Sequence, residues 1–307
     1  MVFLKPVNGD AASMFKSWRY NRLLSWPSTI YLILAIGFIG LLTDGYRTHT
    51  FDDSYLLASA FPYPPDYIRV CGNKNTGPAD HLFSESAQNI SFSVTTPSNY
   101  RSDFAHPLLV VWAPSGLNEK SSERFTGLTQ QATEQGYVVV HPRSVPLGFK
   151  ALKALSTIPA QVMNDWCINP SLVFFTGHSD GGTVSNALTV MPEFKLQPKA
   201  LAPSAMGMRD EDMQAYVCPQ PTSVMLMHNQ GDKHFPGFGA QVIDWWANCN
   251  QCSGEVAPSD HQGCVQYTGC ADGVTTLFCQ AEGGHNYWPG PEHDPLRFFS
   301  TIVAASQ

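Results

Sequence analysis

The chain has little charge of either sign and no excess of positive charge. Of its 307 residues 14% are charged, and 25 acidic against 18 basic side chains give a net charge of -7. A nucleic-acid-binding protein needs a basic surface, so this balance argues against nucleic acid as a partner. Repeats and low-complexity tracts are also lacking, while 43% of the residues are hydrophobic, which is enough to bury a full core.

One stretch lacks charge altogether. Residues 23–43 contain no charged side chain, and as a helix they would span roughly 30 Å, the thickness of a membrane's hydrocarbon core. Residues 1–22 carry four basic side chains against one acidic, which leaves a net charge of -10 for the rest of the chain. The positive-inside bias then predicts a cytoplasmic basic tail over 1–22, a transmembrane signal-anchor over 23–43, and the remainder on the periplasmic or extracellular side. Cleavage of this segment, which would release a secreted protein, is the alternative.

No cysteine precedes the apolar segment, and all eight come after it. An even number of cysteines on the exported side predicts disulfide bonds in an oxidising compartment. Cys249 and Cys252 form a CxxC, but a second CxxC is lacking and the later cysteines are too irregularly spaced for a zinc ribbon. We therefore expect disulfides rather than a metal site, with the pairing left open.

Residues 44–70 form a predicted linker that ends in a proline-rich stretch, and residues 71–307 form one predicted domain. In the domain, short β-branched or aromatic runs alternate with helical stretches, which is typical of a mostly parallel sheet covered by helices. We expect strands over 90–95, 108–113, 137–141, 172–176, 200–203, 224–228 and 274–279. We expect helices over 123–135, 152–166, 181–190, 240–247 and 295–304.

The strongest chemical signal is residues 177–182, which read Gly-His-Ser-Asp-Gly-Gly and lie between a predicted strand and a predicted helix. A G-x-S-x-G in this setting is the nucleophile elbow of the α/β-hydrolase fold, a mostly parallel central sheet with helices on both faces. The turn holds its serine in a strained conformation, and the glycines leave room that a Cβ would fill. The motif therefore predicts Ser179 as a nucleophile at the end of a strand.

Ser179 needs a base, because a hydroxyl is a poor nucleophile at neutral pH. In this fold the order along the chain is serine, acid, histidine. His285 fits the base because it follows the last predicted strand in a glycine-rich loop. His261 precedes that strand, and His293 lies in a polar stretch that resembles an exposed helix start. We therefore expect His285 to be the base, with the other two as competitors.

The acid that orients the base should also follow a strand. Asp232 lies just after the predicted strand 224–228, at the carboxyl edge of the sheet where catalytic loops gather. Gly-Asp is also ordinary turn chemistry, so an Asx-turn is the alternative role for this residue. Asp244 is a weaker candidate because its surroundings are helical, and Asp260 and Asp272 lie in polar loops.

An oxyanion hole needs two backbone N–H groups. One is expected from Asp180, the residue after the nucleophile, and the other from the loop after the strand that ends at Ala113. Pro114 has no N–H to donate, so we expect Ser115 as the second donor, with Gly116 as the alternative.

Two aromatic residues, Tyr287 and Trp288, follow the predicted base. They are candidates for lining a substrate pocket that holds an acyl or aromatic group, and packing alone would explain them equally well. Trp245 and Trp246, in contrast, are expected to pack on the core face of their own helix or to cover a neighbouring loop.

Three stretches together resemble one family. They are residues 177–182, residues 231–236 with the predicted helix up to residue 250, and residues 283–290, which read Gly-Gly-His-Asn-Tyr-Trp-Pro-Gly. These stretches are similar to the polyhydroxybutyrate depolymerase-like esterases, which merge into the secreted feruloyl esterases of carbohydrate esterase family 1. The resemblance extends from about residue 71 to the end of the chain.

The resemblance implies a serine carboxylic-ester hydrolase that acts through an acyl-enzyme, with Ser179, Asp232 and His285 as its triad and no metal or organic cofactor. The implied substrate is a polyhydroxyalkanoate-type oligoester or a related soluble ester. A feruloyl or acetyl ester derived from plant polysaccharide is the alternative, and an inactive membrane-anchored binding module is an alternative of another class. One departure concerns the oxyanion loop, where many members have His-Gly and this chain has Ala113-Pro114.

The resemblance also implies part of the disulfide pattern. It pairs Cys270 with Cys252 or Cys249, and Cys167 with Cys218.

Overall fold

The computed structural model describes Cys71, Lys74 and residues 77–304, all of which belong to the second of two units of the chain, Asp52–Gln307. The predicted tail, transmembrane segment and linker, residues 1–70, lie outside the described residues. Among the helices that are described, none has the length and apolar character that a membrane span requires.

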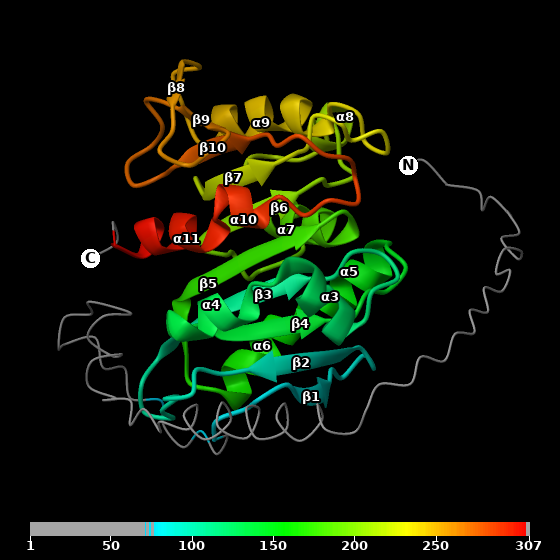
Figure 1. Cartoon of the computed structure of the whole chain (residues 1–307), viewed down its shortest axis with the longest axis vertical. Helices are drawn as coiled ribbons and strands as arrows, with labels where there is room; N and C mark the ends of the chain where they lie inside the picture. The colour runs from blue at the N-terminus through cyan, green and yellow to red at the C-terminus, as the bar shows by residue number, and fades with distance from the viewer. Residues whose placement is uncertain (1–70, 72–73, 75–76, 305–307) are drawn as a thin grey trace, which may run out of the picture. The chain divides into compact units, whose positions relative to one another are not determined.

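One sheet of ten strands runs through the described part of the chain. The strands are β1 (Leu82–Glu85), β2 (Ser91–Thr95), β3 (His106–Trp112), β4 (Val138–Pro142), β5 (Ile168–His178), β6 (Ala200–Ser204), β7 (Ser223–Met227), β8 (Val256–Pro258), β9 (Cys264–Tyr267) and β10 (Thr276–Cys279). Their order is β1-β2-β4-β3-β5-β6-β7-β10-β9-β8, and Figure 1 shows β1 at one end of the sheet and β8 at the other. From β4 to β10 in this order all neighbours are parallel, and the outer pairs are antiparallel. The mostly parallel sheet is confirmed.

Helices cover both faces of this sheet. They are α3 (Glu119–Thr126), α4 (Thr129–Glu134), α5 (Phe149–Leu155), α6 (Thr157–Asp165), α7 (Asp180–Val190), α8 (Asp210–Met213), α9 (Phe238–Cys249), α10 (Gly290–His293) and α11 (Pro295–Ala304). All seven residues of β3 are buried. Leu108, Val110 and Trp112 belong to one core with α5, α6, α7 and α9, whereas Leu109 and Val111 belong to a second core with α4 and α11. A central parallel strand buried on both sides explains why this run of sequence is continuously apolar.

Two of the predicted helices are each divided in two. The stretch 123–135 forms α3 and α4, because Gly127 takes a left-handed conformation with φ of 65° and ends α3. The stretch 152–166 forms α5 and α6, and Pro159 stands in the first turn of α6. A proline inside a continuous helix would remove a backbone hydrogen bond, whereas in the first turn its missing N–H has no helical partner to lose.

Three strands near the ends of the sheet, β1 at one end and β9 and β8 at the other, were absent from the sequence-based prediction. No side chain is buried in β1 or β8, and Cys264 is the one buried residue of β9. Each of these strands is only three or four residues long, which is too short for an apolar or alternating pattern to stand out in the sequence. Their pairing is decided by the neighbouring strand rather than by their own composition.

All eight cysteines are paired, as expected for an exported domain. The disulfides are Cys71–Cys167, Cys218–Cys249, Cys252–Cys270 and Cys264–Cys279. The pairing of Cys270 with Cys252 agrees with the resemblance, but the pairing of Cys167 with Cys218 is wrong. Cys167 lies just before β5 and bonds the start of the domain, whereas Cys218 bonds the last residue of α9. The CxxC is divided between two disulfides.

Candidate active site

The three residues of the predicted triad lie at the same edge of the sheet. Ser179 directly follows β5, Asp232 lies in the loop after β7, and His285 lies in the loop after β10. β5, β6, β7 and β10 are consecutive parallel strands, so their carboxyl ends meet at one edge. Residues that are 53 and 106 positions apart in the sequence are thereby brought within contact distance.

A chain of two hydrogen bonds joins these side chains. Ser179 Oγ lies 2.8 Å from His285 Nε2. On the other side of the ring, His285 Nδ1 lies 2.8 Å from Asp232 Oδ2. A hydroxyl, an imidazole and a carboxylate in this order form the arrangement in which a serine proton can pass to a base whose other nitrogen is held by an acid.

The elbow that carries Ser179 has the strained backbone expected from its sequence. Ser179 has φ of 56° and ψ of -119°, between the end of β5 and the start of α7. A Cβ at Gly181 would lie 2.0 Å from the carbonyl oxygen of Trp112, and one at Gly182 would lie 2.4 Å from that of Ser204. Only glycine therefore allows α7 to approach β3 and β6 this closely, and this approach holds the serine at the sheet edge.

Asp232 is both the partner of His285 and an Asx-turn residue, because each carboxylate oxygen has its own role. Oδ2 faces His285, while Oδ1 accepts hydrogen bonds from the backbone N–H groups of His234 and Phe235 at 2.8 and 2.9 Å. Burial alone would raise the pKa of Asp232, but the hydrogen bonds that it accepts outweigh this effect, and the pKa lies below its ordinary value. The residue is 4% exposed and is therefore a buried, ionised carboxylate.

Aromatic rings surround the imidazole of His285. The ring centres of His234, Phe235 and His178 lie 4.7, 5.0 and 5.4 Å from that of His285, and Phe235 meets it edge-on at 89°. The side chain of His285 is 16% exposed, so one part of the ring remains open to the surface. These contacts limit the ring's rotation without closing the site.

Two residues near His285 were missed by the sequence analysis. His178 Nε2 lies 2.5 Å from the carbonyl oxygen of His285, and Asn229 Nδ2 donates to the carbonyls of Gly284 and Tyr287 at 3.0 and 2.8 Å. His178 belongs to the elbow, and Asn229 belongs to the loop before Asp232. The sequence places them next to Ser179 and three residues before Asp232, but it does not show the backbone carbonyls that they bind.

The competing histidines and acids lie elsewhere. His261 forms a hydrogen bond to the carbonyl of His293 in α10 at 3.1 Å, and His293 forms one to the carbonyl of Gln262, just before β9, at 2.8 Å. Asp244 is on the exposed face of α9, where its carboxylate accepts a hydrogen bond from Tyr267 at 2.7 Å. Asp260 pairs with Arg297.

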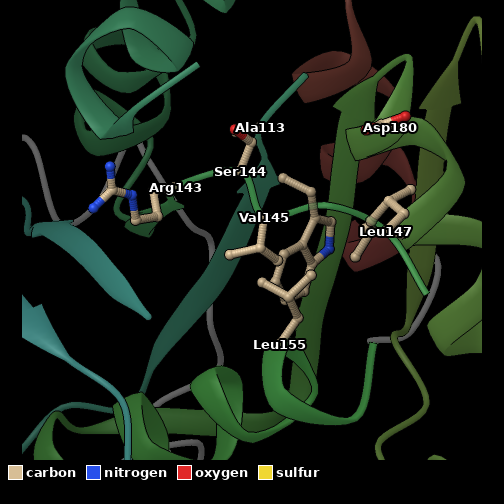
Figure 2. Close-up of a pocket in the computed structure, with 9 residues that line it drawn as sticks. Ala113, Arg143, Ser144, Val145, Leu147, Leu155 and Asp180 are labelled. Carbon is tan, nitrogen blue, oxygen red and sulfur yellow. The ribbon is translucent and has the colours of Figure 1, made fainter. Parts of the chain in front are cut away.

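A small, shallow pocket lies beside the elbow, with a cavity volume of about 10 Å³. Its lining residues are Trp112, Ala113, Arg143, Ser144, Val145, Leu147, Leu155, Asp180 and Val184. Figure 2 shows the apolar side chains of Val145, Leu147 and Leu155 gathered here, while the guanidinium of Arg143 points away from them. The pocket is mainly apolar and reaches the residue next to Ser179.

The two predicted oxyanion donors take different positions. Asp180 is the first residue of α7 and lines the pocket together with Ala113. Ser115 and Gly116 are exposed, in a turn closed by a hydrogen bond from Leu117 N to Pro114 O at 3.2 Å. The assignment of the second donor to Ser115 stays a prediction.

The two aromatic residues after His285 also differ. Tyr287 is 42% exposed, and its hydroxyl donates to Glu292 at 2.5 Å. Trp288 is 5% exposed and belongs to the second core, where its ring meets that of His178 edge-on at 6.1 Å. In the structure Tyr287 is therefore accessible beside the base, and Trp288 packs beneath it.

One group of side chains in the described residues has the spacing of metal ligands. The ligand atoms of Cys264, Cys279 and His293 lie within 4.8 Å of one another. The two cysteines form a disulfide, and metal binding would need their thiolates. In the oxidised protein, the two cysteines of this group therefore belong to the disulfide framework.

Buried histidines make the domain sensitive to acid. Burial lowers the pKa values of His106, His141 and His178 from 6.5 to about 4. Between these pH values the unfolded chain binds more protons than the folded one, so stability is complete above pH 6.5 and falls as the pH drops. We expect the free energy of unfolding to fall by up to about 1.4 kcal/mol per pH unit for each histidine. Urea unfolding at a series of pH values measures this slope, and equal stability at pH 7 and pH 5 would contradict it.

Comparison with known proteins finds an esterase that is similar in sequence and hydrolases that are similar in structure. No protein-family model matches the chain. Feruloyl esterase D of Neurospora crassa is 25% identical over 219 residues, which cover 64% of this chain and 73% of that protein. An acetyl xylan esterase from Aspergillus awamori superposes with a TM-score of 0.56 and 14% identity, over 72% of this chain and 98% of that one. An S-formylglutathione hydrolase from Staphylococcus aureus superposes with a TM-score of 0.52 and 13% identity, over 72% and 97% of the two chains.

The solved structures share the arrangement of the sheet and its helices, and the curated relative matches over the greater part of the chain. Both agree with the motif-based resemblance. The chain has the α/β-hydrolase fold and resembles the feruloyl-esterase branch of these proteins.

Proposed function

We propose that this protein is a carboxylic-ester hydrolase with Ser179 as nucleophile, His285 as general base and acid, and Asp232 as the residue that orients His285. The observation that carries the proposal is the unbroken chain of two 2.8 Å hydrogen bonds from serine to imidazole to carboxylate. The esterases among the relatives support the same reaction class.

The reaction follows from this geometry. Ser179 Oγ attacks the carbonyl carbon of the ester while its proton passes to His285 Nε2, and Asp232 stabilises the imidazolium that forms. Collapse of the tetrahedral intermediate breaks the ester C–O bond, and the proton on His285 leaves with the alcohol. Water then attacks the acyl group on Ser179, again giving its proton to His285. Collapse of this second intermediate breaks the bond between the acyl carbon and Oγ, His285 returns the proton to Oγ, and the acid leaves.

The oxyanion of the tetrahedral intermediate needs donors that are in place before the reaction. The backbone N–H of Asp180 fits this role because it begins α7, where the first N–H groups of a helix have no intrahelical partner. The backbone N–H of Ser115 is the proposed second donor. Many members of the family that the chain resembles have His-Gly at the start of this loop. This chain has Ala113-Pro114, so its loop must take a backbone conformation that is compatible with proline.

For the substrate, we propose an ester with a soluble alcohol part, in which the acyl group is a feruloyl or acetyl group. Feruloyl esterase D and the acetyl xylan esterase are named for such esters, and this supports the choice. The pocket beside the elbow, at about 10 Å³, is far smaller than the roughly 300–1,000 Å³ usual for ligand sites, so we assign no part of the substrate to it. Oligomers of hydroxybutyrate are the second candidate, on the motif resemblance alone.

A fluorophosphonate probe tests the reaction class directly. It should label the wild-type protein at Ser179, detected by mass spectrometry of the labelled peptide, and an inactive binding module would remain unlabelled. A panel of feruloyl, acetyl, p-nitrophenyl and hydroxybutyrate-oligomer esters then compares kcat/KM for each acyl group. Preference for hydroxybutyrate oligomers over both feruloyl and acetyl esters would replace the proposed substrate.

We further propose that residues 23–43 anchor the protein in a membrane, with the catalytic domain on the extracytoplasmic side. The support is the charge pattern around this stretch, together with four disulfides that suit an oxidising compartment.

Removal of residues 1–70 tests both the anchor and the domain boundary. We expect a soluble, folded and active fragment, because Cys71 begins the described domain and bonds it through Cys167. Size-exclusion chromatography, circular dichroism and turnover of a small ester, each compared with the detergent-solubilised full chain, measure the result. If the fragment aggregates after correct oxidation, the removed region belongs to the domain.

A further inference from the structure

We propose that His178 is a positioning residue, which holds the main chain of His285 so that the base meets Ser179. This proposal rests on the ester hydrolysis proposed above. His178 directly precedes Ser179, but its side chain contacts neither Ser179 nor Asp232 through a hydrogen bond. Its partners are the backbone carbonyl of His285 and the hydroxyl of Ser204.

The hydrogen-bond partners determine the tautomer of His178. Its Nε2 lies 2.5 Å from the carbonyl oxygen of His285, and a carbonyl can only accept, so Nε2 carries the proton. Nδ1 then accepts from Ser204 Oγ at 3.0 Å. Burial, at 2% exposure, lowers the pKa of His178 to about 4, so the ring is neutral in this one tautomer at neutral pH.

The loop that carries His285 has little regular structure of its own to fix it. Residues 280–289 lie between β10 and α10 without helix or strand. Asn229 Nδ2 donates to the carbonyls of Gly284 and Tyr287, on either side of the base. His178 donates to the carbonyl of His285 itself. Asn229 therefore fixes the flanks of the loop, and His178 fixes the peptide from which the imidazole projects.

The same contacts link the nucleophile to the base. The backbone carbonyl of Ser204 accepts from Ser179 N at 2.9 Å, while its hydroxyl binds His178. β6, which ends at Ser204, thus supports the elbow and, through His178, the loop of His285. The separation of 2.8 Å between Ser179 Oγ and His285 Nε2 depends on this shared support. A misplacement of about 1 Å between reacting groups can cost about 100-fold in rate.

A buried, hydrogen-bonded histidine can also be purely structural, and His106 provides the comparison. Like His178 it is 2% exposed, and burial lowers its pKa to about 4. It also has two backbone partners, Gly136 O at 3.0 Å and Arg101 N at 3.3 Å. It stands at the start of β3, whereas the triad lies at the carboxyl edge of the sheet. Burial and the number of hydrogen bonds are thus matched, while the partners and the position in the sheet differ.

Two amide substitutions separate the contacts of His178. His178→Gln can place an N–H near the position of Nε2 and keep the bond to His285. His178→Asn is shorter, reaching only the region of Nδ1 and Ser204. We expect His178→Asn to lower kcat for a small ester about 10- to 100-fold with KM little changed. His178→Gln should recover most of this loss, and His106→Asn should lower the melting temperature while leaving kcat within about twofold of wild type.

The proton on His285 Nδ1, in its hydrogen bond to Asp232, gives a second readout. Its low-field ¹H NMR signal should shift or broaden in His178→Asn, and stay unchanged in His178→Gln and His106→Asn. Equal kcat values for folded His178→Asn, His178→Gln and wild type would overturn the positioning role alone. If wild type neither hydrolyses esters nor reacts with the fluorophosphonate, the proposed function fails, and this inference fails with it.

Discussion

Ser179→Ala is expected to lower the turnover of a small ester by about 10⁶-fold, the loss found when the serine is removed from a comparable triad. In the proposed mechanism, Oγ is the only atom of the site that bonds covalently to the acyl group. The backbone of the elbow, the hydrogen bond between His285 and Asp232, and the packing of α7 do not depend on this oxygen. The fold should therefore be unchanged.

Turnover, fluorophosphonate labelling and thermal melting measure this variant against wild type. Ser93→Ala is the matched control, because it removes one hydroxyl from a residue that is 2% exposed on β2, away from the elbow. It should keep both turnover and labelling. If Ser179→Ala retains more than about a tenth of wild-type turnover, Ser179 is not the nucleophile.

Asp232→Asn should lower turnover by about 10⁴-fold while preserving the fold, as the equivalent change does in a serine protease. Oδ1 accepts from the backbone N–H groups of His234 and Phe235, so the asparagine oxygen will take this position. Its NH₂ group must then face His285 Nδ1, where it can only donate. The proton of the imidazole moves to Nε2, which can no longer accept the proton of Ser179.

Asp244→Asn is the control for this change. Its carboxylate lies on the exposed face of α9 with Tyr267 as partner, so the variant should keep wild-type turnover. Both variants are compared with wild type by kcat and by thermal melting. If Asp232→Asn keeps wild-type turnover and Asp244→Asn loses it, Asp244 is the acid. If both variants keep wild-type turnover, the mechanism uses only serine and histidine.

Local features of the chain were predictable from the sequence. The elbow is one example, because the conformation of Ser179 and the close approach at Gly181 depend on a few adjacent residues. The central strands are another, because burial on both faces requires a continuous apolar run such as residues 108–112. The prediction of two undivided helices was wrong for a local reason. Gly127 and Pro159 were both visible in the sequence, but each lay within an otherwise helical pattern.

Features that depend on distant partners were not predictable. Cys167 had seven possible partners, and its bond to Cys71 follows from where β5 begins in the folded sheet. Trp288 follows the base in the sequence, but the chain turns at this point and places the indole in the second core. The roles of His178 and Asn229 depend on backbone carbonyls 107 and 55 to 58 residues away, which no local pattern encodes.

The sequence by itself determined which side chains could do the chemistry, since a serine in a strained turn, a histidine and an aspartate each follow a strand in the order that this fold requires. The tertiary structure decided that these three groups meet, because only the parallel order of β5, β6, β7 and β10 brings the ends of their loops to one edge. It also decided what holds them there. Hydrogen bonds to main-chain carbonyls carry no side-chain signature at the accepting residue, so the support of His285 by His178 exists only in the folded chain.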